Sequence, residues 1–191
     1  IAARDGNIRK INSLLKSGTP VDYTTPGSYT PLAYATARGH LRAASLLLKN
    51  GADINKKGRF DKSPLLLVAG SKHFKSAKFL VDRGADINAL QWHKATCLHE
   101  AALWHQPKNL KFFADIGVDP NIVVGNGSSP LHWTIWRANN DDESSLETAK
   151  TLIKILLEAG AKKSLKTNNG ETAHDFAKNK GLDEIAAMLK P

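Results

Sequence analysis

The chain repeats itself at a fixed interval, and this repetition restricts its possible folds more than any other feature. A series of glycines has members 33 residues apart, with a last interval of 43: Gly18, Gly51, Gly84, Gly117 and Gly160. A series of hydroxyl residues keeps the same intervals: Thr30, Ser63, Thr96, Ser129 and Thr172. Self-similarity at a period of about 20 to 50 residues is typical of repeat architectures. We therefore expect stacked units that contact mainly their neighbours in sequence.

The hydroxyl series predicts where the first helix of each unit begins. Its members open the phrases TPLAYA, SPLLLV, TCLHEA, SPLHWT and TAHDFA. Ser and Thr cap helix N-termini, and proline suits the first helical position because its missing N–H has no helical acceptor there. The glycines predict where second helices end, because glycine adopts the left-handed backbone conformation easily. One unit then contains helices at 31–37 and 41–49, which are too short to be stable alone.

The opening phrases, with the closing phrases KSGTPVD, KNGADIN, DRGADIN, DIGVDPN and EAGAKKS, resemble the ankyrin repeat over essentially the whole chain. The resemblance implies an all-α ankyrin-repeat solenoid of stacked helix-turn-helix units with projecting hairpin-like loops, here called fingers. We expect a single domain, residues 1–191, of about six repeats with the first incomplete: about 1–24, 25–57, 58–90, 91–123, 124–166 and 167–191. The fingers are expected at residues 22–29, 55–62, 88–95, 121–128 and 164–171.

The longer interval places about ten extra residues near 138–148, between the two helices of the fifth repeat. Ser144 and Glu147 have the spacing of a capping box ahead of the apolar run TAKTLIKILL. Asp141, Asp142 and Glu143 would then lie near the positive end of that helix. The sequence therefore predicts a solvated loop followed by a longer, capped helix.

One stripe of each first helix is expected to face outward, because residues three and four positions apart share a helix face. The stripe contains Tyr34, Ala37 and Arg38; Leu67, Gly70 and Ser71; Glu100, Leu103 and Trp104; and Trp133, Trp136 and Arg137. The resemblance implies that partners dock on this stripe and on the finger tips, where Phe60, Trp92 and His93 lie. Exposed indoles are strong interface anchors, worth on the order of 2 kcal/mol or more.

Two interpretations of these tryptophans remain open at this stage. Trp104 and Arg137 hold equivalent positions, and adjacent helices lie about 8 to 10 Å apart, so these two side chains are expected within reach of each other. An aromatic wall would then cross the fourth and fifth repeats. In the alternative interpretation, the rings pack on neighbouring units and on the inserted loop, and Trp133 holds the position that is more easily half-buried.

Positive charge is concentrated in the first half of the chain. Residues 1–95 hold 16 Lys and Arg against 6 Asp and Glu, whereas residues 96–191 hold 11 against 12. An acidic partner is therefore expected at the N-terminal half. The finger sequence KKGRFDK concentrates this charge in Lys56, Lys57, Arg59 and Lys62. It is either a solvated surface or a clamp for an acidic segment, with Phe60 adding a stacking face.

No arrangement typical of catalysis or metal binding occurs in the sequence. The resemblance implies that His99 and His132 hydrogen-bond finger backbones, and Cys97 is expected to be buried. C-x-x-C and H-E-x-x-H spacings do not occur, and GNGSSP lacks the Lys-Ser/Thr ending of a phosphate loop. We therefore predict no enzymatic activity, no metal site and no cofactor.

The predicted function is a monomeric, intracellular protein-interaction module that binds a protein partner, with an acidic segment, in its groove. The chain begins at Ile1 inside a helix-like pattern, so we expect a piece of a longer protein. One cysteine favours a reducing compartment, cytoplasmic or nuclear, in the cell itself or in a host. No apolar run reaches the roughly 18 residues of a membrane span, so insertion is not expected.

Two alternative functions are carried forward from the sequence. In the first, the stack is the targeting arm of an enzyme, an effector or a transporter, because the fold alone does not define function. In the second, the basic half binds nucleic acid or another phosphate-rich ligand. The second is disfavoured because the basic residues lie on several faces and the half that carries most of the tryptophans is not basic. Salt tests it, since the affinity of genuine phosphate contacts falls steeply as salt rises.

Overall fold

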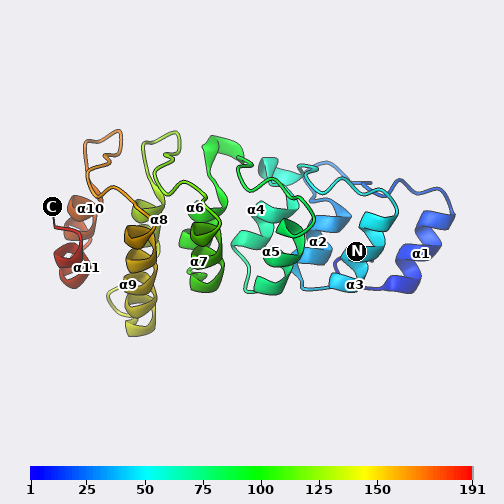
Figure 1. Ribbon diagram of the computed structural model, residues 1–191, viewed down its shortest axis with the longest axis horizontal. Coiled ribbons are helices and arrows are strands. Elements are labelled where there is room, and N and C mark those ends of the chain that lie inside the picture. Colours follow the sequence, from blue (N-terminus) through cyan, green and yellow to red (C-terminus); the bar gives the residue numbers. More distant parts are fainter. Residues whose placement is uncertain (191) are drawn as a thin grey trace. The chain divides into compact units, whose positions relative to one another are not determined.

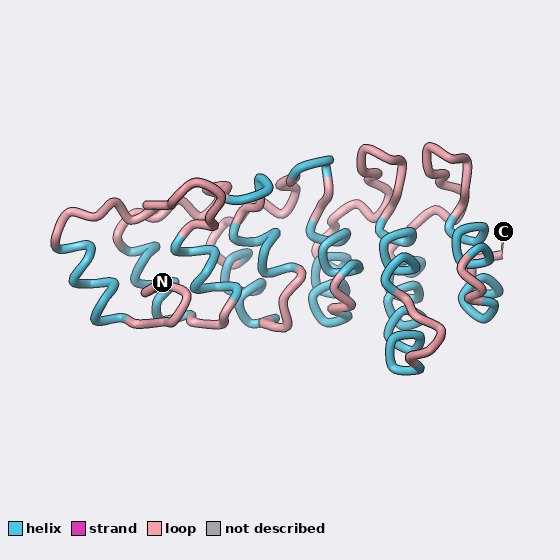
Figure 2. Tube along the Cα trace, turned by 180° about the vertical axis from the view of Figure 1, so that it is seen from behind, coloured by secondary structure: helices cyan, strands magenta, loops and turns pink. Residues whose placement is uncertain are grey.

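The computed structural model describes residues 1–190 (Figure 1), and regular structure in them is helical apart from one isolated bridge between Lys166 and Thr172. The predicted all-α repeat architecture is confirmed. The chain divides into two compact units, Ile1–Trp92 (unit 1) and His93–Pro191 (unit 2). Each unit is built of antiparallel helix pairs, with short loops at one edge and fingers at the opposite edge (Figure 2).

Unit 1 contains one single helix and two helix pairs. Its helices are α1 (Ile8–Lys16), α2 (Pro31–Ala37), α3 (Leu41–Lys49), α4 (Pro64–Ala69) and α5 (Phe74–Val81). The helices predicted at 31–37 and 41–49 are confirmed as α2 and α3. The Thr30 hydroxyl accepts a hydrogen bond from the Ala33 N–H at 3.1 Å, and Pro31 follows it as the first helical residue. This local cap explains why the start of α2 is readable from sequence.

Unit 2 contains three helix pairs of the same kind. They are α6 (Cys97–Leu103) with α7 (Pro107–Asp115), α8 (Pro130–Arg137) with α9 (Glu143–Glu158), and α10 (Ala173–Asn179) with α11 (Asp183–Met188). Helix α6 packs on α8, α8 packs on α10, and α7 packs on α9. The outer helix α9 joins α11 through the Lys150 ammonium, which pairs with both Glu147 and Glu184.

The core of each unit repeats with the sequence. Leu32 and Leu65 in unit 1, and Leu98 and Leu131 in unit 2, hold equivalent positions of successive inner helices and are at most 1% exposed. Burying one leucine side chain contributes roughly 1.5 to 3 kcal/mol. Since each leucine is covered by the adjacent inner helix, a single pair does not bury its own apolar face, and stacking is what stabilises the fold.

The predicted capping box of Ser144 and Glu147 is wrong. Helix α9 begins earlier, and its N-cap is Asp142, whose carboxylate accepts a hydrogen bond from the Ser145 N–H at 3.2 Å. An aspartate caps as well as a serine, and its negative charge also interacts favourably with the positive helix end. The extra residues of this repeat therefore form the loop 138–142 and the first turn of α9.

Candidate interaction surfaces

An open pocket of about 420 Å³ lies in unit 2, between the inner helices and two fingers. It is lined by Leu103, Asn126, Ser128, His132, Trp133, Trp136, Thr167, Asn168, Asn169, Glu171 and Phe176. Three of the predicted site residues, Leu103, Trp133 and Trp136, therefore lie together. The amide-rich finger residues and Phe176 were not predicted individually, although the fingers had been expected to contribute to docking.

Helix α8 places two indoles at this pocket through its cap and its period. Ser129 and His132 form a capping box, which fixes the rotation of the helix at its first turn. Leu131 and Ile135 then face the core and are buried. The opposite face carries Trp136, which is 61% exposed, while Trp133 is half-buried against the edge of the His99 ring at 5.1 Å between centroids.

His99 connects the start of α6 to the next finger. Its Nδ1 accepts hydrogen bonds from the Thr96 N–H at 3.2 Å and from the Thr96 hydroxyl at 3.0 Å. Its Nε2–H therefore donates to the Ser128 carbonyl, at 3.3 Å. Burial lowers the pKa of His99 to about 4, because the charged form loses its hydration there. The predicted structural role of this histidine is confirmed.

His132 makes the equivalent connection one repeat later. Its Nδ1 accepts from the Ser129 N–H at 3.2 Å, and its Nε2–H donates to the Glu171 carbonyl at 3.2 Å. Burial lowers the pKa of this histidine as well. The two fingers also bind each other, because the Asn168 N–H donates to the Asn126 carbonyl at 2.9 Å. Both finger walls of the pocket are thus held by hydrogen bonds.

Lys180 holds the C-terminal end of α8 from the side of α10. Its ammonium donates to three backbone carbonyls, those of Ile135 at 3.1 Å, Trp136 at 2.8 Å and Ala138 at 2.9 Å. Partial burial lowers the pKa of Lys180. A cation at a helix C-terminus satisfies carbonyls that have no helical donor. The backbone that carries Trp136 is therefore fixed at its end.

The outward stripe of α6 was only partly predicted. Trp104 is 50% exposed but does not line the pocket, and Arg137 on α8 is exposed. The expectation that Glu100 faces outward is wrong, since this residue is 2% exposed. The fourth position of each inner helix turns toward the neighbouring helix, and Trp133 at the equivalent position is half-buried for the same reason. Contact between Trp104 and Arg137 stays a prediction.

A second candidate surface lies on two finger tips of unit 1. The rings of Phe60 and Trp92 stack with centroids 6.4 Å apart and planes 12° from parallel, and they are 46% and 60% exposed. The Arg59 guanidinium lies 4.5 Å from the centroid of the Phe60 ring. The Lys57 ammonium donates to the Leu90 carbonyl at 2.9 Å, which links the two fingers. Of the predicted residues of these fingers, Arg59, Phe60 and Trp92 are therefore in contact, and Lys57 joins the two fingers.

The backbone at these tips is strained. Phe60 and Asp61 have φ values of 57° and 55°, and His93 and Lys94 have values of 62° and 68°. Residues other than glycine rarely adopt this conformation, and it costs of order 1 kcal/mol or more at each. The sequence did not predict these conformations, because none of the four positions is a glycine. Lys62, the predicted basic residue directly after Asp61, is half-buried.

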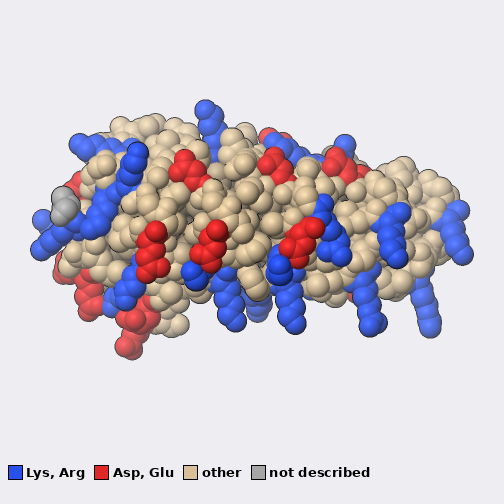
Figure 3. All heavy atoms as spheres, in the orientation of Figure 1, with Lys and Arg blue, Asp and Glu red and all other residues tan. Residues whose placement is uncertain are grey.

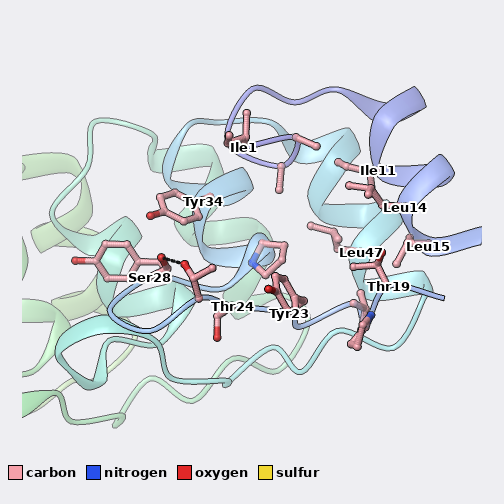
Figure 4. Close-up of a pocket in the computed structure, with 17 residues that line it drawn as sticks. Ile1, Ile11, Leu14, Leu15, Thr19, Tyr23, Thr24, Ser28, Tyr34 and Leu47 are labelled. Carbon is pink, nitrogen blue, oxygen red and sulfur yellow. Dashed lines mark hydrogen bonds between the residues drawn. The ribbon is translucent and has the colours of Figure 1, made fainter. Parts of the chain in front are cut away.

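The remaining predicted residues of unit 1 do not form one surface with these tips. Tyr34 lines a separate hollow of about 210 Å³ near Ile1, together with Ile11, Tyr23 and Leu47 (Figure 4). Its ring lies edge-on to that of Tyr29, with centroids 5.6 Å apart. Arg38 follows α2 as its exposed C-cap residue.

The part of the chain that the structure describes contains no candidate site for a catalytic metal ion. Within residues 1–190, no group of three or more His, Cys, Asp and Glu side chains is placed to hold a metal ion. Cys97 is buried, as predicted. None of the helices between residues 1 and 190 combines the length and the apolar character that a bilayer crossing requires.

Comparison with known proteins identifies the repeat. Residues 1–91 match the family model of ankyrin repeats (3 copies). Among solved structures, an ankyrin repeat domain from Acinetobacter baumannii AYE is similar over 98% of this chain and 93% of that chain, with 27% sequence identity and a TM-score of 0.81. No curated protein matches the sequence.

Proposed function

Because this chain belongs to the ankyrin-repeat family, whose members are generally protein-binding modules, we propose that it is a monomeric, non-enzymatic module that captures a protein partner. The pocket of unit 2 is its main binding site. The finger tips of unit 1 make the additional, basic contacts. Two observations support the proposal, one from each unit.

The observation that carries the proposal is the exposed indole of Trp136 at the wall of an open pocket. Leaving 61% of a tryptophan in water sacrifices burial that the fold would otherwise gain. Apolar walls with a few polar groups at the rim are typical of sites that take a partner's side chain. Here Trp133 and Phe176 supply apolar surface, and Asn126 and Asn168 supply amides that can hydrogen-bond a peptide backbone. We therefore assign an apolar or aromatic side chain of the partner to this pocket.

The finger tips of unit 1 support an acidic character for the partner. Arg59 lies over the Phe60 ring, and Lys57 hydrogen-bonds to Leu90 on the finger that carries Trp92, so a peptide there meets cations and an apolar face together. Carboxylates of the partner would pair with the cations, and its methylene groups would cover the rings. Such contacts speed association and weaken as salt rises.

The proposal is tested with peptides selected from a displayed random library on the wild-type protein. Affinities are then measured by calorimetry for the wild type, Trp136→Ala and Trp104→Ala. We expect Trp136→Ala to weaken binding by roughly 30-fold, which corresponds to about 2 kcal/mol. Tyr23→Ala is the matched control, since it removes a similarly exposed aromatic ring (59%) from unit 1, outside both proposed contact surfaces.

Circular dichroism should show that all three variants keep the helical content of the wild type. Selected peptides whose affinity does not change in Trp136→Ala would refute the assignment of the pocket. Affinity capture with mass spectrometry, comparing the wild type with the Trp104→Ala and Trp136→Ala double variant, then identifies the natural partner. Light scattering of the purified chain tests the monomeric state.

A further inference from the structure

Unit 1 carries a row of cations at the edge opposite its fingers. The row, here called the basic edge, lies on the loops that join paired helices and on the first turns of the outer helices. Its members are exposed: Arg4, Arg9, Lys10, Arg38, Arg42, Lys72 and Lys75. Figure 3 shows Lys and Arg side chains projecting at intervals along this lower edge, below the part of the molecule that holds α1 to α5. The edge lies outside the surfaces proposed for the protein partner, and of its members only Arg38 belongs to the stripe predicted from sequence.

The spacing of the cations is fixed by contacts between successive loops. The Nε2 atom of His40 is 3.1 Å from the Arg4 carbonyl, and the His40 ring lies so close to Gly6 that a Cβ there would be 2.7 Å from it. The His73 ring covers Gly39 in the same way, also at 2.7 Å. The three loops are therefore stacked. The distance between successive loops is therefore about the distance between packed helices, about 8 to 10 Å.

Three of the cations hold equivalent positions in successive repeats. Arg9, Arg42 and Lys75 are each the second residue of their helix, and they are 33 residues apart. The first turns of these three helices contain no acidic residue. Helix N-termini disfavour cations. Helix stability therefore does not account for a cation at the same disfavoured position three times.

The charge of the basic edge is not compensated within unit 1. Asp5, which lies 3.4 Å from Arg4, is the acidic residue of this edge. Of the other carboxylates of unit 1, those of Asp22 and Asp61 lie in fingers, and those of Asp53 and Asp86 lie in the segments that lead from α3 and α5 to the fingers. Asp82 pairs with Lys78 at the end of α5. In the described residues 1–190, none of the six cations other than Arg4 takes part in an ion pair. The edge therefore presents its charge to the surroundings.

We propose that the basic edge docks unit 1, without insertion, on the surface of a bilayer that contains anionic lipids. Clusters of four to eight Lys and Arg side chains attract such surfaces, and each contributes a roughly fivefold gain in affinity. A row of cations on a ridge suits a flat and laterally mobile layer of headgroups. A nucleic acid strand is instead held by a basic groove with stacking rings. The exposed rings of unit 1, Tyr23, Phe60 and Trp92, lie on its fingers, at the opposite edge.

The test is co-sedimentation of the intact chain with phosphatidylcholine vesicles, with and without phosphatidylserine. The edge variant is R9Q/R42Q/K75Q. The matched control, K16Q/K49Q/K56Q, removes the same charge from exposed lysines of unit 1 that lie outside the basic edge. We expect the wild type to bind only the vesicles that contain phosphatidylserine. The edge variant should bind about a hundredfold more weakly, whereas the control should keep more of its affinity.

Thermal unfolding controls for folding, and the edge variant should be at least as stable as the wild type because it removes cations from helix N-termini. Equal losses in the edge variant and the control would show that net charge alone drives binding, and would overturn the proposal. Failure of the wild type to bind the anionic vesicles would overturn it as well. So would binding to an oligonucleotide, but not to vesicles, that is lost in the edge variant.

Discussion

The buried histidine at the start of α6 makes the stability of unit 2 depend on pH. His99 is fully buried, and its pKa is lowered to about 4, against a value of 6.5 for the free side chain. The unfolded state therefore binds the proton more tightly than the folded state, and the free energy of unfolding rises with pH between about 4 and 6.5. The contribution of neutral His99 to the free energy of unfolding is complete above pH 6.5 and is lost as the pH falls to about 4.

The magnitude follows from the difference between the two pKa values. One pKa unit corresponds to about 1.36 kcal/mol, so protonating His99 costs the folded unit about 3 kcal/mol at acid pH. The cost arises because a charged imidazolium would lose its hydration, and because its Nδ1 would become a donor facing the N–H and hydroxyl of Thr96. Burial likewise lowers the pKa values of His105 and His132, so they act in the same direction.

The assay is urea denaturation at pH 7 and at pH 4, followed by tryptophan fluorescence, for the wild type and His99→Gln. Glutamine keeps an acceptor and a donor but does not titrate in this range. We expect the variant to be less stable than the wild type at pH 7. Its free energy of unfolding should fall by about 3 kcal/mol less than that of the wild type between pH 7 and pH 4. If His99→Gln loses as much stability as the wild type, the argument fails.

Four further substitutions test the packing of the repeats and the cap of α9, each by urea denaturation. Gly39→Ala should cost more than about 1 kcal/mol, because φ is +77° and the new Cβ would lie 2.7 Å from the His73 ring; an unchanged midpoint would contradict the stacking of the loops. Asp142→Ala should cost about 1 kcal/mol and Ser144→Ala less than about 0.5, and the reverse order would restore the cap predicted from sequence. Leu98→Ala should cost about 2 to 5 kcal/mol, and a loss below about 1 kcal/mol would show that this position is not part of the core.

The helices were predictable because their ends are decided locally. Thr30 and Pro31 fix the start of α2 through one hydrogen bond and one restricted dihedral, and both act within a few residues. The repeat then carries the same assignment to each later unit. The cap of α9 was missed because Asp142 and Ser144 are both good N-caps two residues apart. Sequence alone does not rank them, since helix ends vary by one or two residues.

The surfaces were less predictable than the helices, because they depend on contacts between residues far apart in sequence. Phe60 and Trp92 stack across neighbouring fingers, and the backbone at Phe60 and directly after Trp92 is left-handed at residues that are not glycine. Glu100 is buried because α6 packs closely on α8, and a helical period does not show how far a neighbour covers each face. The sequence therefore predicted which helix faces and fingers would be involved, but not which of their residues meet.

The pocket and the pH dependence have a common origin in the histidine hydrogen bonds. The His132 Nε2–H donates to the Glu171 carbonyl, and the finger that contains this carbonyl also brings Thr167 and Asn168 to the pocket. A neutral His132 uses Nδ1 as the acceptor of the Ser129 N–H, and this fixes Nε2 as the donor toward the finger. Protonation would remove that acceptor and weaken the cap of α8, the helix that carries Trp133 and Trp136. The side chain that starts the helix thus also holds the finger opposite it, so the stability of unit 2 and the shape of its pocket depend on the same bonds.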